Sequence, residues 1–143
     1  MPSQVFSAHA VAKATARQVW SALQNPETWR KIGGVNEIAN PTFDELGLTG
    51  YNFTVTAGGK SYGGEARRVE ASANQRMVMK IATDQLDGQI TVDLGQLDAH
   101  TDVGVTMEIA SRGFLAGVMF STISNSVAKG YDAAVERFVD SLD

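Results

Sequence analysis

Residues 14–32 read ATARQVWSALQNPETWRKI and hold both tryptophans of the protein, Trp20 and Trp29, on either side of an Asn25-Pro26 pair. Pro is favoured in the first turn of a helix, and Asn is favoured in the capping position before it. The pair therefore divides the segment into two short helices with one tryptophan each. We expect the second helix to end at Gly33-Gly34, since glycine commonly closes helices.

The first of these helices has a clear start and one apolar face. Thr15 and Gln18 have the spacing of a capping box, in which each side chain accepts or donates at the other's backbone. Val19, Trp20 and Leu23 follow at helical spacing and share one face. The segment therefore begins with an amphipathic helix.

A strand is predicted before the helices, over residues 5–14 (VFSAHAVAKA). One side of this strand is apolar throughout and carries Phe6, Ala8, Ala10 and Ala12, whereas the other side is mostly polar. Small alanines on an inner face leave room above a sheet instead of filling it.

From residue 35 to about residue 112, apolar and polar residues alternate, which predicts an antiparallel meander with one apolar face. A strand over Val35–Ile38 is followed by a connection that contains Pro41. Asp87-Gly88 is the strongest hairpin signal in the chain. The expected turns are Gly58-Gly59, Asp87-Gly88 and Asp98–Asp102.

The last part of the chain changes to helical spacing. Its apolar stripe runs over residues 115–142 and consists of Leu115, Met119, Ile123, Val127, Tyr131, Ala134, Phe138 and Leu142. A helix of about 28 residues would span about 42 Å, enough to cross a sheet of this size. No linker interrupts the pattern, so we expect a single domain over residues 1–143.

The composition excludes several functional classes. With 143 residues and a net charge of −4, the chain is a poor partner for nucleic acid, which is bound by neutralising phosphates. There is no cysteine, so thiolate catalysis and Cys-based zinc sites are excluded. The longest apolar run, FLAGVMF at 114–120, is too short for stable membrane insertion. We expect a soluble cytoplasmic protein without a metal or another cofactor.

The order of elements resembles the helix-grip fold of the START-like (SRPBCC) superfamily, which includes polyketide cyclase-like proteins, lipid-transfer domains and birch-pollen-allergen relatives. The resemblance is carried by Ala14, Val19-Trp20 and Leu23, by the motif Asn25-Pro26-Glu27-Thr28-Trp29, and by GYDAAVERFVDSL at 130–142. The glycine-rich hairpin is also similar to that of the G-type proteins of carbon monoxide dehydrogenase. The resemblance implies an α+β fold, in which a curved antiparallel sheet of six or seven strands grips the long C-terminal helix.

This fold implies an elongated apolar cavity between the sheet and the long helix, and hence an apolar small-molecule ligand. Trp20 is expected to pack the helix pair onto the sheet, whereas Trp29 fits either the core or a cavity entrance. The candidate ligand-binding residues are Trp29, Phe53, Tyr62, Met79, Ile81, Met107, Met119, Ile123, Ser126 and Tyr131. The alternative for each apolar member is ordinary core packing, and for Ser126 a solvated helix face.

Arg67 and Arg68 are adjacent on a predicted strand, so one of them is directed inward. That arginine either pairs a ligand carboxylate at the cavity rim or is matched with an acid such as Glu65 or Glu108.

No catalytic constellation is recognisable. His9 lies on the polar side of the first strand and His100 in an expected turn, so neither is placed as a buried base. Three functions remain open. The first is binding or transport of a hydrophobic molecule such as a lipid, quinone or polyketide-like compound. The second is a cyclase, aromatase or dehydratase that holds a reactive chain in a folded pose and uses an inward Tyr62 or arginine. The third is an adaptor for a partner protein with a collapsed pocket.

Overall fold

The computed structural model describes residues 3–33, 37–57, 60–83 and 86–111. The described elements are β1 (Ser3–Ala12), α1 (Ala16–Ala22), α2 (Pro26–Gly33), β2 (Glu37–Asp44), β3 (Gly47–Ala57), β4 (Lys60–Ser72), β5 (Arg76–Thr83), β6 (Leu86–Leu97) and β7 (His100–Ser111). The helix expected over residues 115–142 lies outside the described residues.

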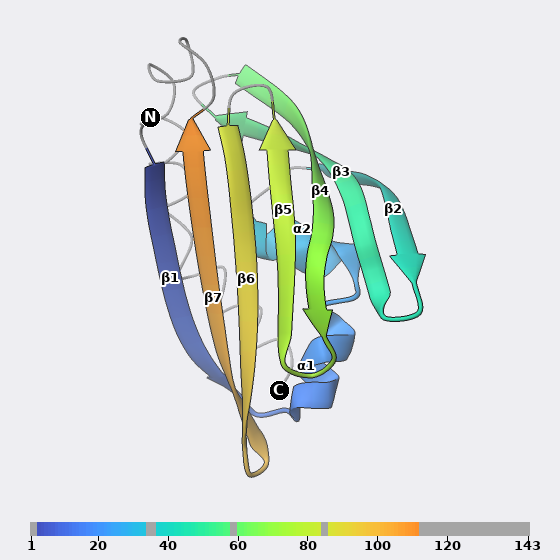
Figure 1. Ribbon diagram of the computed structural model, residues 1–143, viewed down its shortest axis with the longest axis vertical. Coiled ribbons are helices and arrows are strands. Elements are labelled where there is room, and N and C mark those ends of the chain that lie inside the picture. Colours follow the sequence, from blue (N-terminus) through green and yellow to red (C-terminus); the bar gives the residue numbers. More distant parts are fainter. Residues whose placement is uncertain (1–2, 34–36, 58–59, 84–85, 112–143) are drawn as a thin grey trace.

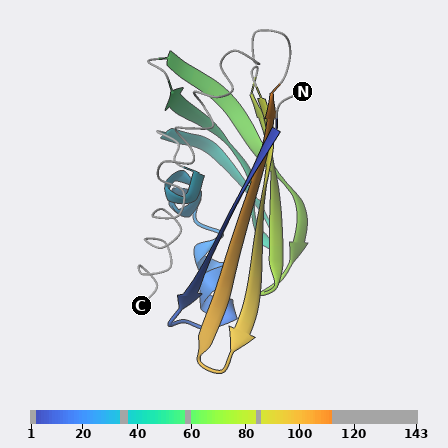
Figure 2. The ribbon, with the colours of Figure 1, turned by 90° about the vertical axis from the view of Figure 1, so that its left-hand side faces the viewer.

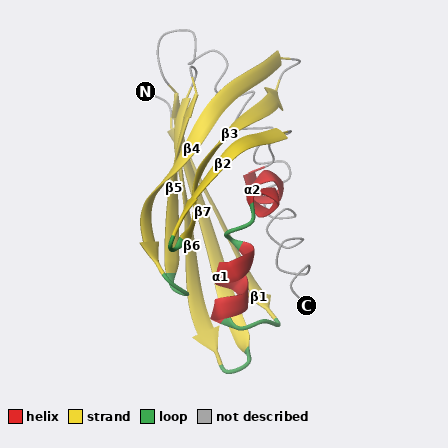
Figure 3. Cartoon of the chain, turned by 90° about the vertical axis from the view of Figure 1, so that its right-hand side faces the viewer, coloured by secondary structure: helices red, strands yellow, loops and turns green. Residues whose placement is uncertain are grey.

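The strands form one seven-stranded antiparallel sheet in the order β1-β7-β6-β5-β4-β3-β2 (Figure 1). Strands β2 to β7 follow one another as hairpins, whereas β1 pairs with the last strand, β7. The sheet is strongly curved, and α1 and α2 lie on its concave side (Figures 2 and 3). The predicted curved sheet with two short helices after the first strand is confirmed.

The helical segment has the predicted local structure. Thr15 caps α1 with a complete capping box to Gln18. Asn25 Oδ1 accepts a hydrogen bond from the Glu27 amide at 3.0 Å, as expected of a cap before Pro26. Helix α2 extends to Gly33, where the sequence places its end.

Both tryptophans bury their side chains where the helix pair meets the sheet. Trp20 is 8% exposed and Trp29 is fully buried. The Trp29 indole Nε1 donates a 2.7 Å hydrogen bond to the Leu23 carbonyl, at the C-terminal end of α1. This bond satisfies one of the backbone acceptors that a helix end leaves free. The segment thus holds two large side chains because they join α1 and α2 to the core.

The prediction for residues 35–41 is wrong in its boundaries. The expected short strand and Pro41 connection form a single strand, β2, which continues to Asp44. Its register with β3 shifts between Ala39 and Thr42, so that Asn40 (φ 53°) and Pro41 form an irregularity inside the strand. Proline is tolerated there because β2 is an edge strand.

The prediction of a hairpin turn at Asp87-Gly88 is also wrong. Both residues lie inside β6, where Asp87 is opposite Ala82 and Gly88 is opposite Ile81 and Ile109. A Cβ atom at Gly88 would come within 3.3 Å of the Ile109 side chain and the Glu108 carbonyl. The glycine therefore permits close packing across the strands, which a rule based on neighbouring residues does not detect.

The remaining boundaries differ by a few residues. β1 spans Ser3–Ala12 where residues 5–14 were expected. The last turn is shorter than expected, because β6 ends at Leu97 and β7 begins at His100. His100 therefore begins a strand and is not part of a turn. β3 and β4 pair up to Ala57 and Lys60, as the Gly58-Gly59 signal predicts.

Candidate functional site

The concave face of the sheet is an apolar wall that crosses most of the strands. Directly opposed residues on antiparallel strands point to the same face of a sheet. One such row joins β1 to β5 and consists of Phe6, Met107, Ile90 and Met79. Its last three members are almost completely buried. The apolar alternation in the sequence therefore identifies the inner face correctly.

A second row on the same face contains smaller residues. Tyr51 on β3 is opposite Ala66 on β4, which is opposite Ile81 on β5, which is opposite Gly88 on β6. Beside it, Phe53 is opposite Gly64, where an added Cβ would lie 2.6 Å from the Phe53 ring. Small residues on β4 thus make room for the two aromatic rings of β3.

Half of the predicted ligand-binding residues come together in this wall. Trp29, Phe53, Met79 and Met107 are buried in one cluster, and Ile81 is half-buried against it. Tyr62 lies on β4 opposite Val55, but its side chain is outside the described part. Met119, Ile123, Ser126 and Tyr131 also lie outside the described residues. The binding role of all ten stays a prediction.

The sequence-based set omits one polar residue of the wall, Tyr51. Its side chain is 6% exposed, and its ring contacts Phe53 edge to face, with centroids 6.3 Å apart. Burial raises the pKa of the Tyr51 phenol well above its ordinary value. The signal for this residue was present in the sequence, because Tyr51 shares the strand parity of Phe53.

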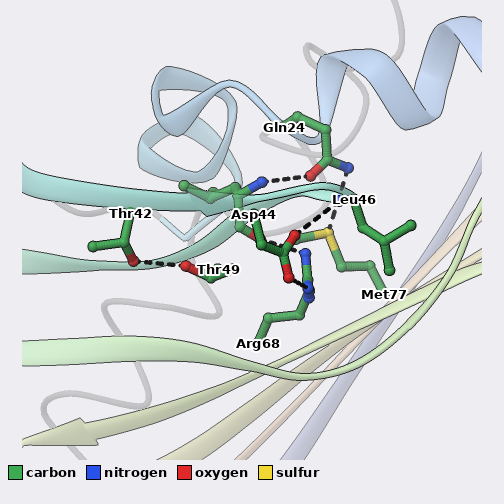
Figure 4. A network of polar contacts seen from close by, with 8 residues as sticks. Gln24, Thr42, Asp44, Leu46, Thr49, Arg68 and Met77 are labelled. Atoms are coloured by element: carbon green, nitrogen blue, oxygen red, sulfur yellow. Dashed lines mark hydrogen bonds and ion pairs between the residues drawn. The ribbon is translucent and has the colours of Figure 1, made fainter.

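The two adjacent arginines point to opposite faces, as expected. Arg67 is exposed and lies 3.4 Å from Glu65. The Arg68 side chain is only 11% exposed, and it donates to the Asp44 carboxylate and, at 3.1 Å, to the Leu48 carbonyl (Figure 4). The acid that matches the inward arginine is therefore Asp44, not Glu65 or Glu108. The Arg68 guanidinium lowers the pKa of the Asp44 carboxyl below its ordinary value.

Gln24 joins the end of α1 to the start of β3 beside this ion pair (Figure 4). Its Oε1 accepts a 2.8 Å hydrogen bond from the Leu48 amide, and its Nε2 donates to the Trp20 carbonyl at 3.0 Å. Gly47, with φ 116°, lies directly against it, since a Cβ there would be 2.2 Å from Gln24 Oε1. The polar groups of this region are thus occupied by one another.

Two open hollows flank this region, and both have mainly polar linings. One of about 370 Å³ lies over β2, β3 and β4, among residues such as Thr42, Asn52 and Arg67. The other, of about 440 Å³, lies between α1 and the turns at Glu45 and Asn74. Neither is the apolar container that the sequence predicts, and the expected second wall of that container, residues 115–142, lies outside the described part.

The described residues hold no group of three or more His, Asp or Glu side chains that is arranged to bind a metal ion. His9 is exposed and lies 3.5 Å from Asp102, and His100 is also exposed. Both histidines are therefore away from the apolar wall. Over the same part of the chain, no helix has the length and apolar character needed to cross a bilayer.

No protein-family model and no curated protein matches the sequence of this chain. Solved structures match its fold. A START superfamily protein from Mycobacterium smegmatis has a TM-score of 0.69 at 14% identity, with 97% of this chain and 99% of that chain covered. The protein TTHA0849 from Thermus thermophilus has a TM-score of 0.74 at 12% identity, with 97% of each chain covered.

A third similar structure is the Zhui aromatase/cyclase from Streptomyces sp. R1128. Its TM-score is 0.66 at 12% identity, and the match covers 96% of this chain and 94% of that chain. Identities this low establish a shared fold and leave the activity open. The curved seven-stranded sheet, the helix pair on its concave side and these likenesses together show that the chain has the START-like fold.

Proposed function

We propose that the protein binds an apolar small molecule, such as a lipid, quinone or polyketide-like compound, against the concave face of the sheet. One observation carries this proposal: several apolar residues of that face stay half-buried although they pack against the buried core. They are Phe6, Ala8 and Ala10 on β1, Ile38 on β2 and Ile81 on β5.

The register places these residues on the inner side of the sheet. Phe6 is opposite the buried Met107, Ile38 is opposite the buried Phe53, and Ile81 is opposite the buried Ala66. Apolar surface that remains accessible beside a core is what an apolar ligand covers, with a gain of about 25 cal/mol for each Å² removed from water. Ligand pockets are mostly apolar, with few polar groups.

The comparisons support the same class of function. A START superfamily protein and an aromatase/cyclase share the fold over nearly the whole chain. Phe53, Met79 and Ile81 are then expected to contact the ligand from the sheet, and Trp29 from α2. The other predicted contacts are Tyr62, Met107, Met119, Ile123, Ser126 and Tyr131.

A fluorescence titration with N-phenyl-1-naphthylamine, a neutral apolar probe, tests the proposal. We expect binding at micromolar concentrations and a loss of affinity of about fivefold or more in Ile81→Phe, because the larger side chain takes up space beside the wall. Val5→Phe is the matched control, since Val5 is 59% exposed on the other side of β1 and should leave affinity unchanged. A wild-type protein that binds neither this probe nor any apolar compound in native mass spectrometry contradicts the proposal.

Catalysis of polyketide cyclisation is a second candidate, favoured by two polar groups in the apolar wall. The Tyr51 hydroxyl and the Arg68 guanidinium both belong to inner-face positions, opposite Ala66 and Met79 respectively. Such an enzyme acts largely by holding a reactive chain in a folded pose. Cyclisation of a poly-β-keto thioester that is faster with the protein than in buffer would favour catalysis over simple binding.

A further inference from the structure

Tyr51 occupies the part of the concave wall where neighbouring side chains are smallest. Across β4 it is opposite Ala66, and the next residue in the row is the half-buried Ile81. The edge-to-face contact with Phe53, at an interplanar angle of 66°, restrains the Tyr51 ring on its other side. Its position is therefore well defined, with open apolar surface nearby.

The Tyr51 hydroxyl is buried without a protein partner in the described part of the chain. The side chain is 6% exposed, and no hydrogen bond joins its hydroxyl to any residue within 3–33, 37–57, 60–83 or 86–111. Buried tyrosine hydroxyls normally have a partner, because an unsatisfied one loses the hydrogen bonds it makes in water.

A second buried hydroxyl in the same core shows the ordinary arrangement. Thr101 is fully buried, and its Oγ1 donates a 2.7 Å hydrogen bond to the Ala14 carbonyl. The two hydroxyls therefore differ in a way that burial does not explain. The hydroxyl of Thr101 completes the structure of the protein itself, whereas that of Tyr51 is available to another molecule.

The surroundings of Tyr51 indicate which chemistry that molecule carries. Burial keeps the phenol protonated at physiological pH, so its hydroxyl is a hydrogen-bond donor. On the described inner face, the nearby cation is Arg68, and Asp44 already neutralises its charge. A carboxylate ligand would have no free counter-charge here, whereas a neutral carbonyl oxygen requires only the donor.

We propose that Tyr51 is the polar anchor of the ligand site and donates a hydrogen bond to a carbonyl oxygen of a neutral, otherwise apolar ligand. Ketones, quinones and esters belong to this class, and free fatty acids do not. This inference rests on the proposed binding function and adds its specificity.

Two neutral probes test the anchor. Prodan (6-propionyl-2-dimethylaminonaphthalene) carries a carbonyl whose hydrogen bonding shifts its emission to the red, whereas N-phenyl-1-naphthylamine carries none. We expect Tyr51→Phe to weaken prodan binding about fivefold to tenfold, the range for loss of one hydrogen bond, and to shift the bound emission to the blue. Binding of N-phenyl-1-naphthylamine should change less than about twofold. Thr101→Val, which removes the other buried hydroxyl, should leave the affinity ratio of the two probes unchanged.

The outcomes separate the two proposals. If the wild type binds both probes and Tyr51→Phe leaves prodan affinity and emission unchanged, the anchor is overturned and the binding function stands. If the wild type binds neither probe, both proposals fail.

Thermal stability without ligand gives an independent check. Tyr51→Phe should keep or raise the melting temperature, because it removes a buried hydroxyl that lacks a partner, whereas Thr101→Val should lower it. An equal loss in both variants would show that Tyr51 has a partner inside the protein, and would overturn the inference.

Discussion

The helix end of the concave face and its open middle are built in different ways. At the helix end, three carbonyls at the C-terminus of α1 receive side-chain donors from Gln24, Thr28 and Trp29. In the middle, apolar residues such as Ile81 remain half-buried and the Tyr51 hydroxyl has no partner among the described residues. The first region satisfies its own polar groups, whereas the second leaves surface and a donor unused.

This difference separates stability from binding within one wall. A region that satisfies every polar group and excludes water contributes to folding and gains little from a ligand. A region with accessible apolar surface is less stable by itself and gains most when a ligand covers it. Substitutions at the helix end should therefore change stability, whereas substitutions in the middle should change affinity.

Trp29 provides the strongest test of the helix end. Trp29→Ala should cost about 3–5 kcal/mol of unfolding free energy, because it leaves a large cavity in the core. It also leaves the Leu23 carbonyl without its indole donor. Trp29→Phe, the matched control, keeps most of the volume and should cost roughly 1–2 kcal/mol for the lost hydrogen bond. Urea denaturation measures both, and a cost below about 1 kcal/mol for Trp29→Ala would remove the distinction between the two regions.

Gly47 and Gln24 test whether the polar contacts of that region act as a unit. Gly47→Ala should cost about 1–3 kcal/mol, since φ 116° strains any side chain and the new Cβ would displace Gln24 from the Leu48 amide. In a Gln24→Ala background the displacement no longer matters, so Gly47→Ala should cost less there. A double-mutant cycle by urea denaturation measures the coupling, and strict additivity would show that the two residues act separately.

How much of this was predictable from the sequence depends on the range of each interaction. The helix pair was predicted because its signals are local, such as the capping box of Thr15 and Gln18 and the Asn25-Pro26 pair. The apolar wall was predicted because period-two alternation reports one face of a strand, as Met79 and Met107 show.

Features that depend on register were missed. Asp44 is 24 residues from Arg68, and the two meet only because β2 and β4 both pair with β3. Gly88 imitates a turn signal, but its role is to admit Ile109 across the ladder. Tyr51 has the correct parity, yet the lack of a partner for its hydroxyl becomes visible only when the residues around it are placed.

The ion pair between Asp44 and Arg68 gives the smallest predicted effect, on the pH dependence of stability. The pKa of Asp44 is lowered from its ordinary value of 3.8, chiefly by the hydrogen bond from Arg68. A carboxyl whose folded-state pKa is lower than its unfolded-state pKa stabilises the protein above the unfolded-state value. That contribution is lost as the pH falls through the folded-state value. The wild type should therefore lose stability below about pH 4, in part through this pair.

Asp44→Asn removes the titrating group, so its stability should fall less steeply between about pH 4 and pH 2. Glu65→Gln is the matched control, because Glu65 pairs with the exposed Arg67 at 3.4 Å, and screened surface pairs contribute little. Thermal melts across this pH range compare the three proteins. If the slope of Asp44→Asn equals that of the wild type, the pair does not stabilise the fold, and Arg68 would then be free to serve the ligand site as Tyr51 does.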